Sequence, residues 1–481
     1  MIKNLIKSKK EVVILGVGKV FQIIIALLAI KLLTTILSEK EVGQYYLLLT
    51  ILALFDFAFL NPIGQYFGRY VIGWQYSGKL RAATNLLIII RFLAIICSLI
   101  IAFIIYLYFD YNQAYGLSEF LLFIFFSLLS GTYLVLLNNL NTLGLRMIFI
   151  KYLVLSLLFG LIFSLLITKY IMGNGMGWLY GIALAQLIFL YPVYIHFTNK
   201  SSLSLRQLKA AIKKKDIQKV LFFIVPITIT LFLQWGQNSS YRLIIGDKYS
   251  VEILAFIAVG FSVSSAIFNA VSSLTLQYFN PLYLKAITNA TKENRVIAWN
   301  NLATVVFPIY TCLMLFVICL SPYFLNILVA DKFQGAYIYV VLGAVIEFFR
   351  VSSNVVYMVS QSEVKTTTTI IPYVLGFLSS ILTLCFIDFT EHLWLISVVL
   401  SLSYCLVFIL LYFNMKKILP VKIKSSGIYK SMFLSLPFTV VPLINYPPSW
   451  FLSILLIGFF GMYFMFCVYL LTRTTMEAFK E

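Results

Sequence analysis

Five charged side chains lie deep inside long apolar runs of this sequence. They are three cations and two carboxylates: Lys19, Asp56, Arg91, Glu347 and Arg350. Each falls near the middle of its run, too far from either end for the charged group to reach water easily. A charge in apolar surroundings costs free energy unless it is paired or solvated. These residues are therefore expected to line a polar path or to pair with one another.

The spacing of the five charges allows two ion pairs, which would leave one cation without a carboxylate partner. Lys19 and Asp56 lie at similar depth in consecutive apolar runs, so they could form an ion pair. Glu347 and Arg350 are three residues apart and could pair on one helix, either as a structural link or as a group that titrates. An unpaired buried cation is costly, so the remaining positive charge favours an anionic ligand.

Other polar residues in or beside the runs admit two interpretations. Lys31 and Arg242 stand near the ends of their runs, where they could contact a ligand or reach lipid head groups. Four amides could bind a hydroxyl-rich ligand or join helices: Asn61, Gln234, Gln237 and Asn238.

The sequence predicts neither a catalytic site nor a metal site. Its two histidines, His196 and His392, stand alone at the ends of apolar runs. All six cysteines lie within such runs and none forms a CxxC pair, as is typical of small packing residues. No ATP-binding motif is recognisable and no cofactor is expected, so transport would run on a gradient, for example of protons or sodium ions, or on the substrate's own downhill flow.

The elements that position these residues are membrane-spanning helices. The chain has 481 residues, of which 62% are hydrophobic and 11% charged, and its mean hydropathy is +0.98. Repeated apolar runs of about 20 residues each suffice to cross a bilayer core of about 30 Å as a helix. The sequence therefore predicts an all-α integral membrane protein with fourteen spans, at 11–37, 42–66, 82–108, 118–140, 152–171, 176–197, 220–244, 252–276, 296–320, 337–360, 367–388, 393–414, 431–447 and 450–471.

The distribution of basic residues predicts the orientation. Apart from the five cations within the runs that are named above, 27 of the 36 lysines and arginines fall in loops on one side. Only four fall on the other side or at its edge: Lys40, Lys169, Lys248 and Lys332. Because the side rich in lysine and arginine faces the cytoplasm, both termini are expected there. The net charge of +19 is thus explained by cytoplasmic loops and lipid contacts, and nucleic acid is not an expected partner.

The order of spans suggests two halves. We expect an N-terminal six-helix half at 1–197, a linker at 198–219, a C-terminal half at 220–414 and an added two-helix segment at 415–481. Leu205, Leu208 and Ile212 share one helical face of the linker, with lysines opposite, which predicts an amphipathic helix on the inner membrane surface. A faint repeat supports the halves, because Lys31-Leu32 precedes Gln65-Tyr66-Phe67 at nearly the spacing that separates Arg242-Leu243 from Gln277-Tyr278-Phe279.

The first hairpin carries a family resemblance. Its basic residue and Leu-Leu-Thr (31–34), its turn ending Glu41-Val42-Gly43, and Tyr45-Tyr46 resemble the first hairpin of bacterial polysaccharide exporters. The likeness continues in Asn61-Pro62-Ile63-Gly64, Arg69, Asn139, Leu143-Gly144, Arg146, Pro226 and Arg242. The chain thus resembles the Wzx-type lipid-linked oligosaccharide flippases of the multidrug/oligosaccharidyl-lipid/polysaccharide exporter superfamily. One departure is Tyr241, where many relatives have an aspartate directly before the arginine.

The resemblance implies a flippase of the bacterial cytoplasmic (inner) membrane. Its substrate would be an undecaprenyl-diphosphate-linked oligosaccharide, moved from the inner to the outer leaflet by alternating access for surface polysaccharide such as O-antigen or lipopolysaccharide. A polysaccharide polymerase and a chain-length regulator would be partners. Lys19, Arg91 and Arg242 would hold charge, with Lys31 and Asn61 also on the path, and Asp56 or Glu347 would carry a coupling ion.

Two other functions remain open on the sequence. A cation-coupled multidrug antiporter of the same superfamily would require mainly acidic residues in its cavity, whereas basic ones predominate here. A membrane polysaccharide polymerase or glycosyltransferase would place its catalytic groups in a large loop, and the one long loop here is rich in lysine and has no paired carboxylates.

Overall fold

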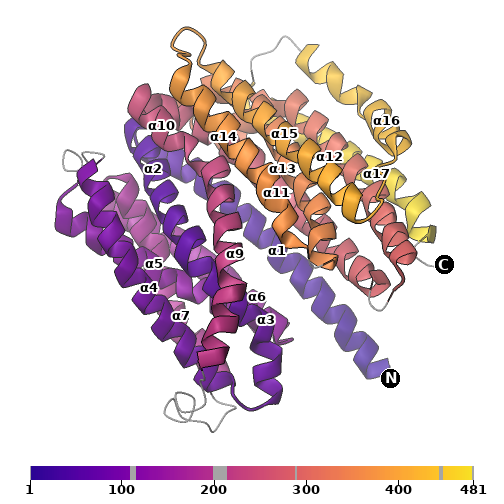
Figure 1. Cartoon of the computed structure of the whole chain (residues 1–481). Coiled ribbons are helices and arrows are strands. Elements are labelled where there is room, and N and C mark those ends of the chain that lie inside the picture. Colours follow the sequence, from indigo (N-terminus) through magenta and orange to yellow (C-terminus); the bar gives the residue numbers. More distant parts are fainter. Residues whose placement is uncertain are drawn as a thin grey trace. The chain divides into compact units, whose positions relative to one another are not determined.

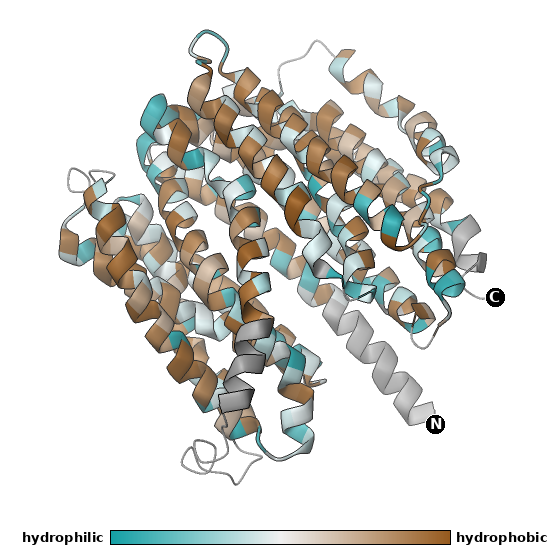
Figure 2. Cartoon of the chain, viewed as in Figure 1, coloured by the Kyte–Doolittle hydropathy of each residue, from teal (hydrophilic) through white to brown (hydrophobic). Residues whose placement is uncertain are grey.

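The protein is built from long helices. The computed structural model describes residues 2–108, 115–198, 214–287, 290–363, 365–443 and 448–478. Every regular element in these ranges is a helix, which confirms the all-α prediction. Twelve helical stretches among the described residues are long and apolar enough to cross a bilayer. Figure 2 shows that apolar residues cover most of their length, so the chain is a multi-pass membrane protein.

By its internal contacts the chain forms two units, and the divisions between them fall within two helices, at 30–35 and at 235–236. The first comprises Met1–Ala29 and Ile36–Trp235, and the second Ile30–Thr35 and Gly236–Glu481. The predicted division into 1–197, 220–414 and 415–481 stays a prediction. Of the predicted linker 198–219, residues 199–213 lie outside the described residues, and the face formed by Leu205, Leu208 and Ile212 lies with them.

The first unit contains the helices drawn from indigo to magenta in Figure 1. They are α1 (Ile2–Ile36), α2 (Glu39–Phe55), the π-helical turn η1 (Asp56–Leu60), α3 (Asn61–Tyr76), α4 (Leu80–Tyr108), α5 (Leu117–Thr142), α6 (Arg146–Tyr170), α7 (Gly175–Thr198) and most of α9 (Lys214–Ser239).

The second unit continues from magenta to yellow, and α12 contacts four other helices within it, namely α11, α13, α16 and α17. Its elements are α10 (Tyr241–Lys248), α11 (Val251–Ile287), α12 (Lys292–Leu328), η3 (Asp331–Ala336), α13 (Tyr337–Ser362), η4 (Thr366–Thr369), α14 (Ile370–Phe386), α15 (Trp394–Ile418), α16 (Ser425–Leu434), η5 (Leu436–Leu443) and α17 (Trp450–Ala478).

The twelve stretches correspond to twelve of the fourteen predicted spans. The predicted span 220–244 is divided, because α9 ends at Ser239 and α10 begins at Tyr241. The predicted span 431–447 is not one α-helix. There α16 ends at Leu434, and Pro437 and Pro442, which lack an N–H, fall in the 3₁₀ helix η5.

Local sequence signals set several helix ends in the first unit. The Ser38 hydroxyl accepts the Glu41 N–H at 3.2 Å and so caps α2. The helices α3 and α5 both end with a left-handed glycine, at Gly78 (φ 69°) and Gly144 (φ 79°). After each glycine a backbone N–H bonds back to the helix, as Leu145 N does to Leu140 O at 2.9 Å. A side chain at either glycine would strain these turns.

Two apolar clusters hold the first unit together. One includes Phe55, Phe120 and Phe123, and the other includes Phe67, Tyr133 and Phe197. Along α5 the clusters fall on either side of residues 130–132. Side chains near the middle of the helices therefore lie between the two apolar clusters. The polar residues described next lie in this middle region.

Candidate functional site

A π-helical turn interrupts the second predicted span at the buried carboxylate. The turn η1 runs from Asp56 to Leu60, and the Asn61 N–H bonds to Asp56 O rather than to the carbonyl four residues back. Pro62 follows and lacks an N–H of its own. Because the turn holds one extra residue, Asp56 and Asn61 lie on the same face although they are five apart.

A row of polar side chains follows from this geometry. Asn61 Nδ2 donates to Asp56 Oδ2 at 3.5 Å, and Gln65 Nε2 donates to Asn61 Oδ1 at 3.0 Å. The row runs from the middle of the unit toward the far end of α3. Of its three members, Gln65 is exposed and the other two are half-buried.

Arg91 on α4 is held beside this row and retains an unused donor. Its side chain is 1% exposed. Nε donates to Thr132 Oγ1 at 3.1 Å, and Nη1 donates to Leu60 O at 3.0 Å. Nη2 is buried and has no hydrogen-bond partner. Asp56 interacts with Arg91 through space, but the two are not within ion-pair distance.

The polar row forms one wall of a cavity within the first unit. The cavity measures about 630 Å³ and is lined by residues of α2, η1, α3, α5 and α7. Most of its polar side chains are amides or hydroxyls: Asn61, Gln65, Ser127, Asn138, Asn139 and Gln186. Ser127 Oγ is buried without a partner, like Arg91 Nη2. A buried polar atom without a partner costs free energy, so a ligand that bonds to it would recover this energy.

The other predicted first-unit residue, Lys19, does not line this cavity. It is half-buried on α1, and its Nζ donates to Gln22 Oε1 at 3.0 Å. The suggested ion pair of Lys19 with Asp56 is not formed. Lys19 and Asp56 were expected at the same depth in the membrane. Equal depth did not bring them together, because it does not determine which way each helix turns its side chain.

Lys31 has a structural role within the second unit. Its Nζ donates to the carbonyls of Asn326 and Val329, at the C-terminal end of α12. One turn later, Thr34 Oγ1 accepts the Ala330 N–H at 3.1 Å. A cation at the carbonyl end of a helix is stabilising. The structure thus shows a helix-end contact for Lys31 in addition to the two interpretations considered above.

The second unit holds Arg242 among aromatic groups and amides. Its guanidinium lies over the Tyr241 ring, 5.6 Å from the centroid, so the residue that departs from the family pattern is a neighbour of the cation. Tyr404 donates to Asn238, and the buried Gln237 Nε2 has no partner. Gln234 is half-buried on α9 in the first unit.

Glu347 and Arg350 form the local ion pair that their spacing suggested. The carboxylate is 7% exposed and accepts the Arg350 Nε at 2.8 Å. Arg350 Nη2 also donates to Asn269 Oδ1 on α11 at 2.8 Å. The pair is therefore linked to a second helix.

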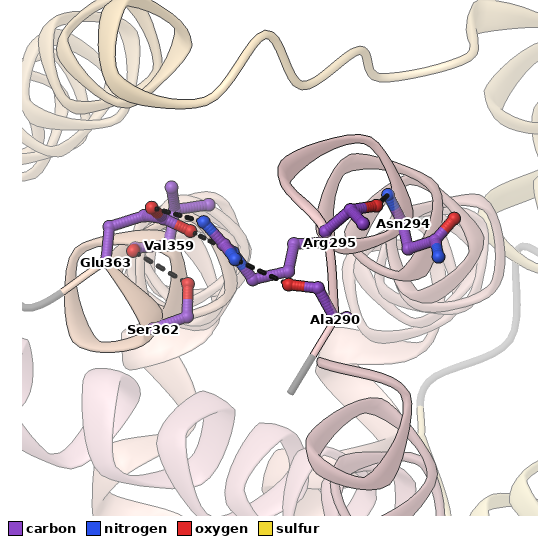
Figure 3. Close-up of polar contacts among 7 residues, drawn as sticks. Ala290, Asn294, Arg295, Val359, Ser362 and Glu363 are labelled. Carbon is purple, nitrogen blue, oxygen red and sulfur yellow. Dashed lines mark hydrogen bonds and ion pairs between the residues drawn. The ribbon is translucent and has the colours of Figure 1, made fainter. Parts of the chain in front are cut away.

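Several polar contacts were not singled out in the sequence. Arg295 at the start of α12 makes a two-point ion pair with Glu363 at the end of α13, with N···O distances of 2.7 and 3.1 Å. Figure 3 shows the two side chains facing each other, with Arg295 also donating to Ala290 O. Both residues lie outside the predicted spans, where they look like ordinary loop charges. The cavity residues Gln65, Ser127 and Gln186 carry a weak signal, as polar side chains near or inside apolar runs.

The described residues include no group of three or more His, Cys, Asp or Glu that could hold a metal ion.

No protein-family model matches the sequence, and no curated protein matches it. Solved structures do match. The lipid II flippase MurJ in an inward closed conformation aligns with a TM-score of 0.66 and 14% identity, over 97% of this chain and 99% of that one.

Two transporters of the MATE type align as well. A eukaryotic MATE transporter gives a TM-score of 0.56 and 13% identity, over 90% of this chain and 99% of its own. An inward-facing multidrug resistance MATE family transporter of the MOP superfamily gives 0.56 and 12%, over 89% and 96%.

The chain has the fold of these transporters. At such low identity the likeness concerns the fold, and the alignments cover nearly all of each chain. This fold positions the cavity inside the first unit, with Asp56 and Asn61 in its wall and Arg91 bonded to the lining residue Leu60.

Proposed function

We propose that this protein is a flippase for undecaprenyl-diphosphate-linked oligosaccharides. It would move repeat units from the inner to the outer leaflet of a bacterial cytoplasmic membrane by alternating access, as a transporter and not as an enzyme, for surface polysaccharide synthesis. The observation that carries the proposal is the first-unit cavity, whose wall includes amides and hydroxyls, together with the buried Arg91, which bonds to the lining residue Leu60 and keeps an unused donor.

The cavity suits both parts of such a head group. A guanidinium forms strong, directed hydrogen bonds to phosphate oxygens, and Arg91 has one N–H group free to do so. Amides and hydroxyls both donate and accept, as sugar hydroxyls require. The fold is also that of a lipid flippase, MurJ. Lys19 and Arg242 remain proposed as further positive charges on the path.

Asp56 is the proposed coupling group. It lies in the wall of the cavity, whereas Glu347 is already bonded to Arg350. Binding of a proton or sodium ion at Asp56 would remove the negative charge that faces Arg91 through space. A polysaccharide polymerase and a chain-length regulator remain the proposed partners.

Asp56 also supports the second candidate, a cation-coupled multidrug antiporter. Several of the structural matches are MATE transporters, and a carboxylate in a cavity can hold a cation. The amides and hydroxyls of the lining favour a sugar. The apolar side chains that make up the rest of the lining would also suit a drug-sized ligand, because such ligands usually occupy mostly apolar sites. No observation in the structure favours a polymerase or a glycosyltransferase.

The test replaces Arg91 by lysine, which keeps the charge but cannot make three directed contacts. Purified protein is reconstituted with fluorescent undecaprenyl-diphosphate oligosaccharide, and outer-leaflet access is measured. We expect Arg91→Lys to flip at least about tenfold more slowly, equivalent to about 1.4 kcal/mol, whereas Arg81→Lys at the start of the same helix flips normally. Normal flipping by folded Arg91→Lys would remove Arg91 from the substrate site.

A further inference from the structure

A second row of side chains lies on α3 beside the polar row. It consists of Tyr66, Tyr70 and Trp74, which are spaced by four residues and so by about 6 Å along the helix. The ring centroids of Tyr66 and Tyr70 are 4.8 Å apart, and those of Tyr70 and Trp74 are 5.9 Å apart. The three rings therefore form a continuous aromatic surface, here called the aromatic row.

The aromatic row is partly exposed, and its last ring, Trp74, also packs against Phe67 of the apolar core. Tyr70 is 41% exposed, and Tyr66 and Trp74 are half-buried. Phe67 and Val71 on the other face of α3 are 2% and 0% exposed and fix the helix to the apolar core. Burial of that face determines which side of α3 remains open, so the row is a fixed feature of the first unit.

The polar row runs parallel to it along the same helix. Its members Asn61 and Gln65, and Arg69 beyond them, are also four residues apart, and Gln65 and Arg69 are exposed. The Arg69 guanidinium lies 5.2 Å from the centroid of Phe223 on α9, and Phe223 in turn packs edge-on against Tyr66 at 5.6 Å. Figure 1 shows α3 beside the lower part of α9. Phe223 thus orients both a cation and an aromatic ring.

Only the first residues of α3 reach the cavity. Asn61, Gly64 and Gln65 at the start of α3 line the cavity, and the aromatic row begins one residue later. A ligand held on α3 would therefore lead directly to the side of Arg91. The surface has the two properties that a sugar chain requires: flat apolar faces for the C–H side of sugar rings, and amide and guanidinium donors for their hydroxyls.

We propose that α3 is a glycan platform, on which the aromatic row stacks successive sugar rings of the lipid-linked oligosaccharide while Gln65 and Arg69 bond to their hydroxyls. The inference rests on the proposed function and deepens it, because it places the sugar chain on α3 and the diphosphate near Arg91. Aromatic residues at helix ends also anchor proteins at the membrane surface. The experiment separates the two roles.

The experiment compares two probes that differ only in sugar number. One is undecaprenyl diphosphate carrying a single N-acetylglucosamine, and the other carries a tetrasaccharide. Binding to the full-length protein in nanodiscs is measured for wild type, for Tyr70→Leu and for the double variant Tyr66→Leu/Tyr70→Leu. Tyr191→Leu is the control, because Tyr191 is 68% exposed near the end of α7 that is predicted to face the same side. Thermal unfolding confirms that each variant is folded.

We expect the wild type to bind the tetrasaccharide probe more tightly than the single-sugar probe. The double variant should lose about tenfold in affinity for the tetrasaccharide alone. Tyr70→Leu should lose less, and Tyr191→Leu should lose nothing. The tetrasaccharide should also change the intrinsic fluorescence of the wild type, and Trp74→Phe should abolish that change while the affinity is retained.

Three outcomes would overturn the platform. Equal wild-type affinity for both probes would do so while leaving the flippase function intact. So would an equal loss for both probes in the double variant, or the same loss in Tyr191→Leu, since these results indicate membrane anchoring. If the wild type neither binds nor flips either probe, the proposed function itself is wrong, and the platform is wrong with it.

Discussion

At the scale of single residues, the protein satisfies its buried charges mainly with neutral groups. Arg91 is held by a hydroxyl and a backbone carbonyl, and Lys31 by two backbone carbonyls. Such contacts keep a cation ionised without cancelling its charge. A cation held in this way stays available to an anionic ligand, which a closed ion pair would not allow.

Glu347 and Arg350 are the contrasting case, and they yield a stability prediction. Arg350→Met leaves a nearly buried carboxylate without its partner, so we expect a loss of about 3 kcal/mol, seen as a lower unfolding temperature in detergent. The double variant Glu347→Leu/Arg350→Met should recover most of this loss, because it removes both charges. If the double variant were less stable than the single one, the pair would not act as a closed structural link.

The sequence predicted which residues carry buried charge, but not all of their partners. Glu347 and Arg350 were paired correctly because three residues on one helix define a geometry. Lys19 was paired wrongly with Asp56, because the contact of two helices depends on their rotation. The π-helical turn at Asp56–Leu60 shifts that rotation, and hydropathy carries no record of it.

At the scale of elements, helix ends and helix crossings depend on a few small or charged groups. Lys31→Met should lower stability by about 1 kcal/mol, since it removes the cation that bonds to the end of α12. Flipping per folded molecule should be unchanged. Lys40→Met, at an exposed position in the first turn of α2, is the control and should alter neither quantity. A large loss of flipping in stable Lys31→Met would instead assign Lys31 to the substrate path.

The crossing of α6 and α7 yields the second prediction at this scale. A Cβ at Gly181 would lie 2.2 Å from the Ser164 backbone nitrogen, so the two helices would have to move apart. Gly181→Ala should cost about 3 kcal/mol. Gly458→Ala in α17 should cost nothing, because no atom lies within 4 Å of its added Cβ. Equal unfolding temperatures for the two variants would contradict the close crossing.

The apolar runs predicted the long helices well. They gave wrong helix boundaries where a helix has one polar face or contains prolines. The second span was predicted to end at residue 66, yet the helix continues to Tyr76, because α3 buries Phe67 and Val71 on one face while its other face is polar. Apolar residues at helical spacing are buried on one face of α3, so the helix continues beyond the point where the sequence stops being uniformly apolar. The predicted thirteenth span was broken by prolines, as described above.

At the scale of the whole molecule, the orientation in the membrane remains a prediction from charge. We expect a cysteine at position 391 to react with an impermeant thiol reagent applied from outside, and one at 292 to react only after lysis. The variants are Glu391→Cys and Lys292→Cys in a Cys97→Ser/Cys385→Ser background, since Cys97 and Cys385 are exposed. The opposite labelling pattern would invert the proposed direction of transport.

The transport assay in proteoliposomes tests the central claim most directly. Wild-type protein is supplied either with fluorescent undecaprenyl-diphosphate oligosaccharide or with a cationic dye, each with and without a proton or sodium gradient. We predict protein-dependent appearance of the oligosaccharide in the outer leaflet, faster with one of the gradients, and no transport of the dye. Gradient-driven efflux of the dye without flipping of the oligosaccharide would contradict the flippase and would identify the cavity of Asp56 and Arg91 as the site of a cation-coupled antiporter.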